Sequence, residues 1–586
     1  MFIKFRATLH SLVKRMPEKQ LLIIGAVIVG VWAGLTAVLL KISVHYLQEQ
    51  IRTMASTSVL LYMIAPAVGI LLSLAFVHFV LKGDLQKGTS HVMLAIANKS
   101  SRLPRKETFS HAITSALTVG FGGSAGLESP IVQTGSAIGS TFASFFPIGF
   151  RNRTLLLACG AAAGIATAFN APIAGVLFAL EVLLVDISIS AFIPLLIAGA
   201  TGALCSKIIL SENILLSFRH ISNFNYHNVP YYIALGIVCG LVSVFYLRVF
   251  RSLEGFFRQT IKHHWLRFLI GVSMLGGLIV LFPPLLGEGY SSIITLATLD
   301  PGQLFTDSPL FEFVAHHPVR LGLLVLIVGL VKVVAVTCTL SAGGNGGNFA
   351  PALLVGACIG FAFSFLINVT GVGGLPTSNF SLVAMAGLLT GIFHAPLTAI
   401  FLIAEITGGY DLIIPLMIVS ALSTAVSKYL NPKSLDQAKL EEDGGMAGIS
   451  KDTHVLSELS AKSFIERDFV AVSSQHTLRE LLNKVANSKR NIFPVLNENG
   501  TLAGVIYLEN IREIMFNASL YDVTKVTDLM QPPVLTVDAE EPMSAIMEKF
   551  DKSGVWNIPV IQEGKYAGFI SKSRIFSTYR ERMKVD

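Results

Sequence analysis

The chain has 586 residues, of which 52% are hydrophobic and only 14% are charged, and its mean hydropathy is +0.65. Soluble domains carry about 25% charged residues, so this composition excludes a purely soluble globular protein. The formal net charge is +7, but basic residues do not alternate with aromatic residues in any stripe, which argues against nucleic-acid binding. We therefore expect an integral membrane protein with a soluble part.

Residues 1–20 mix basic side chains, such as Lys4 and Arg6, with apolar ones. This pattern predicts an amphipathic segment on the cytoplasmic face of the membrane. No apolar core with a small-residue cleavage site follows it, so we predict no cleavable signal peptide. The five cysteines lie in or beside apolar segments at no spacing typical of metal ligands, which predicts packing roles and no disulfide framework.

Residues 21–430 form the predicted membrane domain. Its apolar segments approach or exceed the roughly 20 residues that span a bilayer, and glycine and proline interrupt several of them. A soluble core does not need so many such segments in succession. The segments are Leu21–Leu40, Val59–Leu81, Leu155–Val185, Tyr231–Val249, Leu321–Val336, Ala350–Ile367 and Leu382–Ile406.

The membrane domain repeats itself. NAPIAGVLFALE, ending at Glu181, returns as HAPLTAIFLIAE, ending at Glu405, and GLESP, ending at Pro130, has a counterpart in GNFAP, ending at Pro351. Nearly the same offset separates both pairs, which predicts a polytopic α-helical membrane protein with an inverted internal repeat and broken helices. The two repeats are expected at about residues 21–215 and 230–430.

GLESP and GNFAP have the composition of helix starts. Proline suits the first helical turn, and the glycines before it let the backbone bend and approach a ligand. Inside a membrane, such a start presents unpaired N–H groups and the positive end of the helix dipole, for which an anion is the natural partner. Glu128 of GLESP could take the place of that anion and leave when protonated, which would make it a gate; the alternative is a purely structural cap.

The composition changes near residue 431, where a linker of residues 431–461 is expected. Beyond it, FPVLNENGTLAGVI is echoed by IPVIQEGKYAGFI, each copy with a helical pattern before it. The two units, residues 462–520 and 525–583, resemble a pair of cystathionine-β-synthase-type (CBS) domains. This resemblance implies a C-terminal α/β tandem.

Together the motifs GSAGLESP, GNFAP, NAPIAGVLFALE and GGYDLIIP, followed by the paired CBS-like units, resemble the voltage-gated chloride channel family. Its members are chloride channels or proton–chloride antiporters. The resemblance implies a homodimer with one pore per subunit. The compactness of the chain predicts a bacterial-type plasma (inner) membrane, and both termini are expected on its cytoplasmic side. The resemblance also implies that Glu128 is the gating residue, that the backbone amides of Asn348 and Phe349 bind chloride, and that the hydroxyl of Tyr410 reaches the anion.

The first anion-coordinating loop of the family matches poorly. Here the stretch reads QKGTSHVM, which places Lys87 at the position of the usual serine, while a shift of two residues would place Thr89 there. We expect Lys87, Gly88 and Thr89 near the anion. A lysine would add a cation beside it, a threonine would keep a hydroxyl donor, and Lys87 could instead extend toward the cytoplasmic vestibule. In GLESP, Leu127 replaces a common arginine, which weakens the positive field at the outer mouth.

Proton coupling depends on the residue after Glu181. Antiporters of the family usually carry a second glutamate there, whereas this chain has Val182, as many channels do. We therefore predict a chloride channel, with a proton-coupled antiporter as the alternative. In an antiporter Glu181 could relay protons, although its counterpart Glu405 favours a structural role in which both carboxylates satisfy neighbouring helix ends.

The CBS-like pair lacks the aspartate that often holds a ribose. The equivalent positions are Tyr507 with Asn510 in the first copy and Ser571 with Arg574 in the second. Ser571 and Arg574 are the candidates for an adenine nucleotide, because an arginine can bind phosphate. A purely structural module is the preferred interpretation.

Functions of other classes fit less well. An intramembrane metalloprotease needs a zinc motif such as H-E-x-x-H, and no pair of histidines has this spacing, so neither catalytic nor metal-ligating residues are predicted. His394 is interpreted as a packed or water-facing residue. A divalent-cation transporter with CBS domains would line its path with clustered carboxylates. We predict no enzyme, and no cofactor beyond the possible nucleotide.

Overall fold

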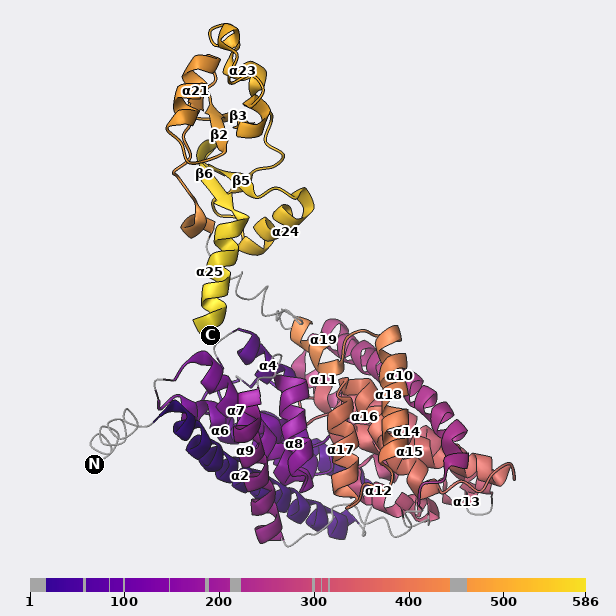
Figure 1. The fold of residues 1–586 in the computed structure, drawn as a ribbon. Coiled ribbons are helices and arrows are strands. Elements are labelled where there is room, and N and C mark those ends of the chain that lie inside the picture. Colours follow the sequence, from indigo (N-terminus) through magenta and orange to yellow (C-terminus); the bar gives the residue numbers. More distant parts are fainter. Residues whose placement is uncertain are drawn as a thin grey trace, which may run out of the picture. The chain divides into compact units, whose positions relative to one another are not determined.

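The computed structural model describes residues 17–55, 59–83, 85–98, 101–146, 148–184, 189–210, 223–297, 301–306, 308–314, 317–442 and 461–585. Most of the predicted amphipathic N-terminus, residues 1–16, and residues 443–460 of the predicted linker lie outside these ranges. The chain divides between residues 447 and 448 into two compact units (Figure 1).

The first unit is helical in all its described parts, and eight of its described helices are long and apolar enough to cross a membrane. Its first half contains α2 (Glu18–Ala55), α3 (Val59–Phe79), α4 (Thr89–Ala97), α5 (Glu107–Gly120), α6 (Glu128–Ala143), α7 (Phe150–Phe169), α8 (Pro172–Phe178) and α9 (Ile189–Leu210). Its second half contains α10 (Val229–Thr260), α11 (His264–Leu281), α12 (Tyr290–Ala297), α13 (Phe311–Val314), α14 (Pro318–Ser341), α15 (Phe349–Val369), α16 (Thr377–Phe393), α17 (Pro396–Ile406), α18 (Ile413–Leu430) and α19 (Leu435–Glu442).

Two long apolar stretches are each broken into a pair of helices. After α7, Asn170 adopts a left-handed conformation with φ 53°, and α8 begins at Pro172. After α16, His394 does the same with φ 56°, and α17 begins at Pro396. A left-handed residue ends a helix and a proline suits the first turn of the next, so the same signals break both repeats at the same point.

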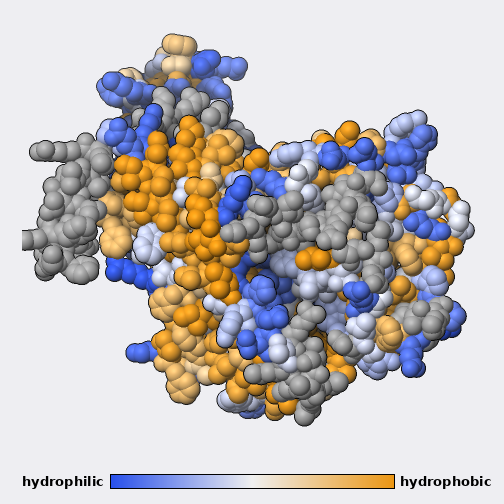
Figure 2. Space-filling view, turned by 90° about the horizontal axis from the view of Figure 1, so that it is seen from below, coloured by the Kyte–Doolittle hydropathy of each residue, from blue (hydrophilic) through white to orange (hydrophobic). Residues whose placement is uncertain are grey.

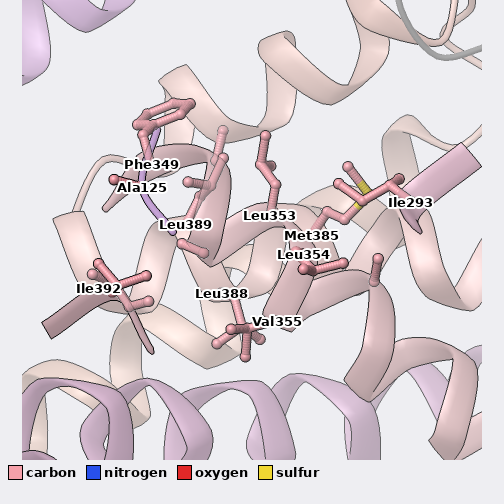
Figure 3. Close-up of a cluster of buried hydrophobic side chains, with 14 of the residues drawn as sticks. Ala125, Ile293, Phe349, Leu353, Leu354, Val355, Met385, Leu388, Leu389 and Ile392 are labelled. Carbon is pink, nitrogen blue, oxygen red and sulfur yellow. The ribbon is translucent and has the colours of Figure 1, made fainter. Parts of the chain in front are cut away.

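Side chains of α15 and α16 pack closely in the core of this unit. Leu353 and Leu354 of α15 and Leu388 and Leu389 of α16 are at most 2% exposed, and Figure 3 shows them filling the space between the two helices. At the outside, many large apolar side chains are exposed, and Figure 2 shows broad hydrophobic areas on one face of the molecule. An apolar exterior around an apolar core is typical of a protein surrounded by lipid.

Glycines allow the backbones of neighbouring helices to touch. A Cβ atom on Gly160 of α7 would lie 1.9 Å from the carbonyl oxygen of Gly135 in α6, and a Cβ on Gly135 would lie 2.2 Å from that of Gly160. The corresponding helices of the second repeat also touch, since a Cβ on Gly360 of α15 would lie 2.2 Å from the Phe380 oxygen of α16. Small residues at such contacts are the usual basis of helix packing in membranes.

The second unit contains two copies of a β-α-β-β arrangement. The first copy has β1 (Val472–Ser473), α21 (Leu478–Ala486), β2 (Ile492–Leu496) and β3 (Leu502–Tyr507), with short helices α22 (Leu508–Ile511) and α23 (Val526–Leu529) after it. The second has β4 (Val537–Asp538), α24 (Met543–Ser553), β5 (Asn557–Gln562), β6 (Lys565–Ser571) and then α25 (Lys572–Val585). In each sheet the first pair of strands is parallel and the second antiparallel, in the orders β1-β2-β3 and β4-β5-β6.

The glycine contact between α6 and α7 can be tested with Gly160→Ala. The methyl group has no space beside Gly135, and overpacking of this kind costs about 1–3 kcal/mol, so we expect a lower thermal unfolding temperature of the purified protein in detergent. Gly277→Ala is the matched control, because no atom lies within 4 Å of a Cβ built on Gly277. An equal loss of stability in both variants would contradict the packing argument.

Candidate functional site

A reciprocal pair of backbone hydrogen bonds joins the two predicted helix starts. The N–H of Gly126 donates to the carbonyl oxygen of Gly347 at 2.8 Å, and the N–H of Gly347 donates to that of Gly126 at 2.8 Å. Side chains do not fit here, because a Cβ on Gly346 would lie 2.4 Å from the Cβ of Ala125, and one on Gly347 would lie 2.7 Å from the Cβ of Ser129. The starts of α6 and α15 therefore meet inside the unit, as the sequence pattern indicated.

Glu128, the first residue of α6, points its carboxylate at the start of α15. Its side chain is buried, with the residue 3% exposed. Oε1 accepts a hydrogen bond from the hydroxyl of Tyr290 at 2.7 Å, and Oε2 accepts one from the backbone N–H of Ala350 at 3.3 Å. The carboxylate thus occupies a position at a helix N-terminus that suits an anion.

A cavity of about 190 Å³ adjoins this carboxylate. The starts of α4, α6 and α15 border it, with apolar side chains between them and charged side chains at the part formed by α10 and α19. Residues of the expected anion site that line it are Lys87, Gly88, Thr89, Glu128, Asn348 and Phe349. The remaining lining residues are Ser129, Val132, Ile165, Phe178, Phe250, Glu254, Leu340, Gly346, Gly347, Phe393, Leu435, Asp436 and Lys439.

Both candidates in the loop before α4 reach the cavity. The ammonium of Lys87 donates to the carbonyl oxygens of Gly343 at 2.6 Å and Gly344 at 2.9 Å, so it clamps the segment that leads into α15. Thr89 begins α4, and its hydroxyl lies 3.2 Å from that of Ser129. Lys87 and Thr89 therefore both line the cavity: Lys87 places its charge at the cavity wall, and Thr89 places its hydroxyl there.

Side-chain contacts hold the start of α15 in place. Asn348 precedes the helix, and its Oδ1 accepts a hydrogen bond from the hydroxyl of Tyr246 at 2.9 Å. The ring of Phe349 packs against those of Phe169 and Phe393, at centroid distances of 5.6 and 5.5 Å. Asn348 and Phe349 both line the cavity, and the role of their backbone amides as anion donors stays a prediction.

Tyr410 is not brought to the cavity. It lies in the turn between α17 and α18, is 49% exposed, and meets the ring of Phe401 edge-on. Part of the cavity wall comes from α19, within the stretch interpreted as linker. A sequence signal for α19 exists, because Ser434 and Gln437 form a reciprocal capping pair that marks a helix start.

Sequence reasoning also missed two polar residues that support Glu128. Tyr290, which donates a hydrogen bond to the Glu128 carboxylate, lies 162 residues after Glu128 in the chain. Lys332 of α14 is fully buried, and its ammonium donates to the carbonyl oxygens of Leu285 at 3.0 Å and Gly287 at 2.9 Å, just before Tyr290. The lone lysine within the apolar run of α14 was the available signal.

Glu181 of the first repeat caps a helix of the second repeat, and Glu405 of the second repeat caps a helix of the first. Glu181 lies in a π-helical turn, Ala179–Leu183, and its carboxylate accepts hydrogen bonds from the backbone N–H groups of Leu397 at 3.2 Å and Thr398 at 2.8 Å, at the start of α17. Glu405 accepts in turn from the N–H groups of Ile173 at 3.1 Å and Ala174 at 2.8 Å, at the start of α8. Each carboxylate therefore serves as a helix cap.

In the second unit, the serine named as a candidate for binding a nucleotide already has a partner. Ser571 is 5% exposed, and its hydroxyl donates to the carboxylate of Glu466 at 2.7 Å. Arg490 donates to Glu466 at 2.5 Å and binds Asp468 through several contacts of 2.7–3.0 Å. These hydrogen bonds from Arg490 hold the pKa of the Asp468 carboxyl below its usual value. The backbone N–H of Arg574 donates to the Ser571 hydroxyl at 3.3 Å.

Comparison with known families decides the relationship. A model described as voltage gated chloride channel matches residues 68–428, more than half of the chain, and a CBS domain model matches residues 461–517 and 526–581. The chain belongs to the voltage gated chloride channel family. The predicted family and fold class are thereby confirmed.

Similar members of this family carry names of both functional kinds. The putative chloride channel protein ClcB-like of Ralstonia nicotianae is 30% identical over 362 residues, which cover 61% of this chain and 80% of that protein. The H(+)/Cl(-) exchange transporter ClcA of Yersinia pseudotuberculosis is 26% identical over 447 residues, which cover 74% of this chain and 90% of that protein. The fold matches the crystal structure of a slow cyanobacterial Cl-/H+ antiporter with a TM-score of 0.61 and 22% identity, over 73% of this chain and 98% of that one.

The capping role of Glu181 predicts the behaviour of Glu181→Gln. The NH₂ group of the new amide cannot accept a hydrogen bond from a backbone N–H, so we expect a loss of about 1–3 kcal/mol in stability. The ratio of protons to chloride in liposome assays should stay unchanged. Glu405→Gln is the matched control and should behave alike. Loss of proton movement in Glu181→Gln alone would contradict a purely structural role.

The Arg490 network predicts that Arg490→Ala loosens the second unit. The nearly buried carboxylate of Glu466 would lose its cationic partner, at a cost of about 1–3 kcal/mol, so hydrogen exchange of β2 and β6 in the full-length protein should rise. The contribution of Asp468 is present above the ordinary aspartate pKa and is lost as the pH falls through its lowered value. Arg479→Ala, which breaks the exposed pair with Asp522, should have little effect.

Proposed function

We propose that the protein transports chloride across a membrane and exchanges it for protons. The main observation in support is the position of the Glu128 carboxylate, which accepts a hydrogen bond from the Ala350 N–H at the start of α15, beside the cavity. Membership of the family supports chloride transport, and the likeness to a named H(+)/Cl(-) exchange transporter supports exchange over simple conduction. This choice favours the antiporter alternative over the channel that Val182 suggested.

In the proposed mechanism, chloride and the Glu128 carboxylate compete for the same helix N-terminus. Chloride enters the cavity, where the starts of α4, α6 and α15 present positive dipole ends and Lys87 adds a positive charge. When Glu128 takes up a proton, it loses the charge that draws it to the Ala350 N–H. The side chain then leaves, and chloride can occupy the vacated position. Return of the carboxylate requires release of the proton, which links the two ions.

A channel is the second candidate function, and Val182 is the observation that favours it. Val182 packs against the apolar core beside Glu181 and offers no proton-accepting group. In this version Glu128 still gates the pathway, but its protonation is not tied to each transported chloride. Chloride flux without proton movement in the wild-type protein would select this version.

We further propose a homodimer in a plasma (inner) membrane, with both termini cytoplasmic. Apolar side chains on α8, α17 and α18 are exposed. Exposed fractions are 38% for Ile173, 50% for Leu397, 50% for Ile414 and 55% for Met417. Such a surface suits burial against a second copy within the bilayer.

For the CBS pair we propose a structural role without a bound nucleotide. Glu466 occupies the hydroxyl of Ser571, so an adenine nucleotide would have to displace a carboxylate that Arg490 also holds. The carboxylate would in addition repel a phosphate. Glu466 instead accepts hydrogen bonds from Arg490, just before β2, and from Ser571, at the end of β6. These bonds connect the beginning of the unit to both of its sheets.

Glu128→Gln tests the gate. The amide cannot ionise, so chloride flux from liposomes should become independent of pH and proton movement should fall to the background level. Chloride efflux and proton movement are recorded together under a chloride gradient. The wild-type protein should drive protons uphill in the same assay.

Glu49→Gln, in an exposed position of α2, is the matched control and should keep wild-type exchange. Unchanged pH dependence in Glu128→Gln would remove the gate assignment. Absence of chloride flux in the wild-type protein would remove the proposed function itself.

A further inference from the structure

Helix α5 carries a buried polar stripe that the transport site does not explain. Glu107, His111, Thr114 and Thr118 follow one another at helical spacing, so they share one face of the helix. Each is at most 3% exposed. Buried polar and ionisable groups are costly in a membrane protein, and for this reason they usually mark a functional path.

One end of the stripe is a cluster of three titratable side chains. The Oε1 atom of Glu107 lies 3.2 Å from Nε2 of His91 in α4, and its Oε2 atom lies 3.8 Å from Nε2 of His111. The side chains are 4%, 14% and 0% exposed for Glu107, His91 and His111. One carboxylate therefore stands between two imidazoles, and His91 is the most exposed of the three side chains, although its Nδ1 atom is buried without a hydrogen-bond partner among the described residues.

Several polar atoms of this region lack a hydrogen-bond partner among the described residues. Both ring nitrogens of His111 are in this state, although Nε2 remains within ion-pair reach of Glu107. The hydroxyl of Ser110, Oδ1 of Asn345 and the hydroxyl of Ser124 are also unpaired in the described structure. Buried polar groups of this kind are usually satisfied by ordered water, and water between them would conduct protons.

The unpaired atoms lead from the cluster toward the gate. Asn345 donates from its side chain to the hydroxyl of Thr114 at 2.7 Å, and from its backbone to the hydroxyl of Thr118 at 3.0 Å. Thr118 also accepts at its carbonyl oxygen from the N–H of Gly123 at 2.9 Å, just before Ser124. The stripe thus contacts both segments that pair at Gly126 and Gly347, next to Glu128.

We propose that His91, Glu107 and His111 form the inner proton-exchanging site of this transporter. The inference rests on the proposed exchange function and assigns to α4 and α5 the role that Val182 leaves open. A proton from the cytoplasmic solution binds a ring nitrogen of His91, passes through the Glu107 carboxylate to His111, and continues through water along Ser110, Asn345 and Ser124 to Glu128. No covalent bond other than those to the proton changes.

The surroundings of the cluster contain other charges that any pH profile would include. Glu107, His91 and Lys87 interact electrostatically with His111. The helices that pack on α5 are α2, α3 and α6. Their titratable and charged residues are Glu18, Lys19, Lys41, His45, Glu49 and Arg52 of α2, His78 of α3 and Glu128 of α6. Helix α4, which carries His91, also packs against α19, with Asp436, Lys439, Glu441 and Glu442, and against the π-helical turn with Glu181.

The test compares His111→Gln and Glu107→Gln with the wild-type protein in liposomes, with chloride flux and proton movement recorded together. We expect the proton-to-chloride ratio to fall by about tenfold or more while chloride flux persists. Glu107→Asp should restore part of the ratio because it keeps an ionisable carboxylate. His45→Gln, at an exposed position of α2, is the matched control and should keep the wild-type ratio.

His91→Gln changes the most exposed of the three side chains, so it is the variant to use if a buried substitution prevents folding. It should also lower the proton-to-chloride ratio. An unchanged ratio in folded variants would overturn the proposal, and so would parallel loss of both fluxes. Chloride flux without proton movement in the wild-type protein would overturn the relay while leaving chloride transport intact. Absence of wild-type chloride flux would defeat the proposed function as well.

Discussion

The pairing of Gly126 with Gly347 is the constraint on which the arrangement of the membrane unit depends. Two backbone segments can exchange hydrogen bonds inside an apolar unit only if both helices stop short of the centre and no side chain intervenes. The pair brings one helix start from each repeat to the same place. Glu128 and the Ala350 N–H meet there as a direct result, and the cavity lies beside them.

Two lysine side chains contribute to the same construction. Lys87 and Lys332 each donate to two backbone carbonyl oxygens, and each holds a loop beside Glu128. A lysine can supply more than one hydrogen bond from a single point charge, so it can pin a bent backbone that has no helical partners. In this arrangement the charge serves the shape of the site as well as its potential.

The sequence predicts those parts of the site that are encoded by local rules. GLESP and GNFAP could be recognised as helix starts because the preference of proline and glycine is a property of a few adjacent residues, and the repeated motifs placed them in equivalent positions. Tyr290 could not be found in this way, since its contact with Glu128 depends on how distant segments fold together. Tyr410 is the opposite case: its motif is recognisable, but its side chain is half exposed, contacts Phe401 and is not among the residues that line the cavity. The wall residues of α19 were hidden because a polar stretch after the last apolar segment resembles a linker.

The exchange of caps between α8 and α17 has a consequence for biogenesis. Glu405 satisfies the start of α8, although more than half of the membrane unit separates the two in the chain, and Glu181 must wait equally for the start of α17. During synthesis the first repeat enters the bilayer before its cap exists. Its α8 segment can reach its final state only once residue 405 has left the ribosome, so the start of α8 is satisfied only after most of the second repeat has been synthesised.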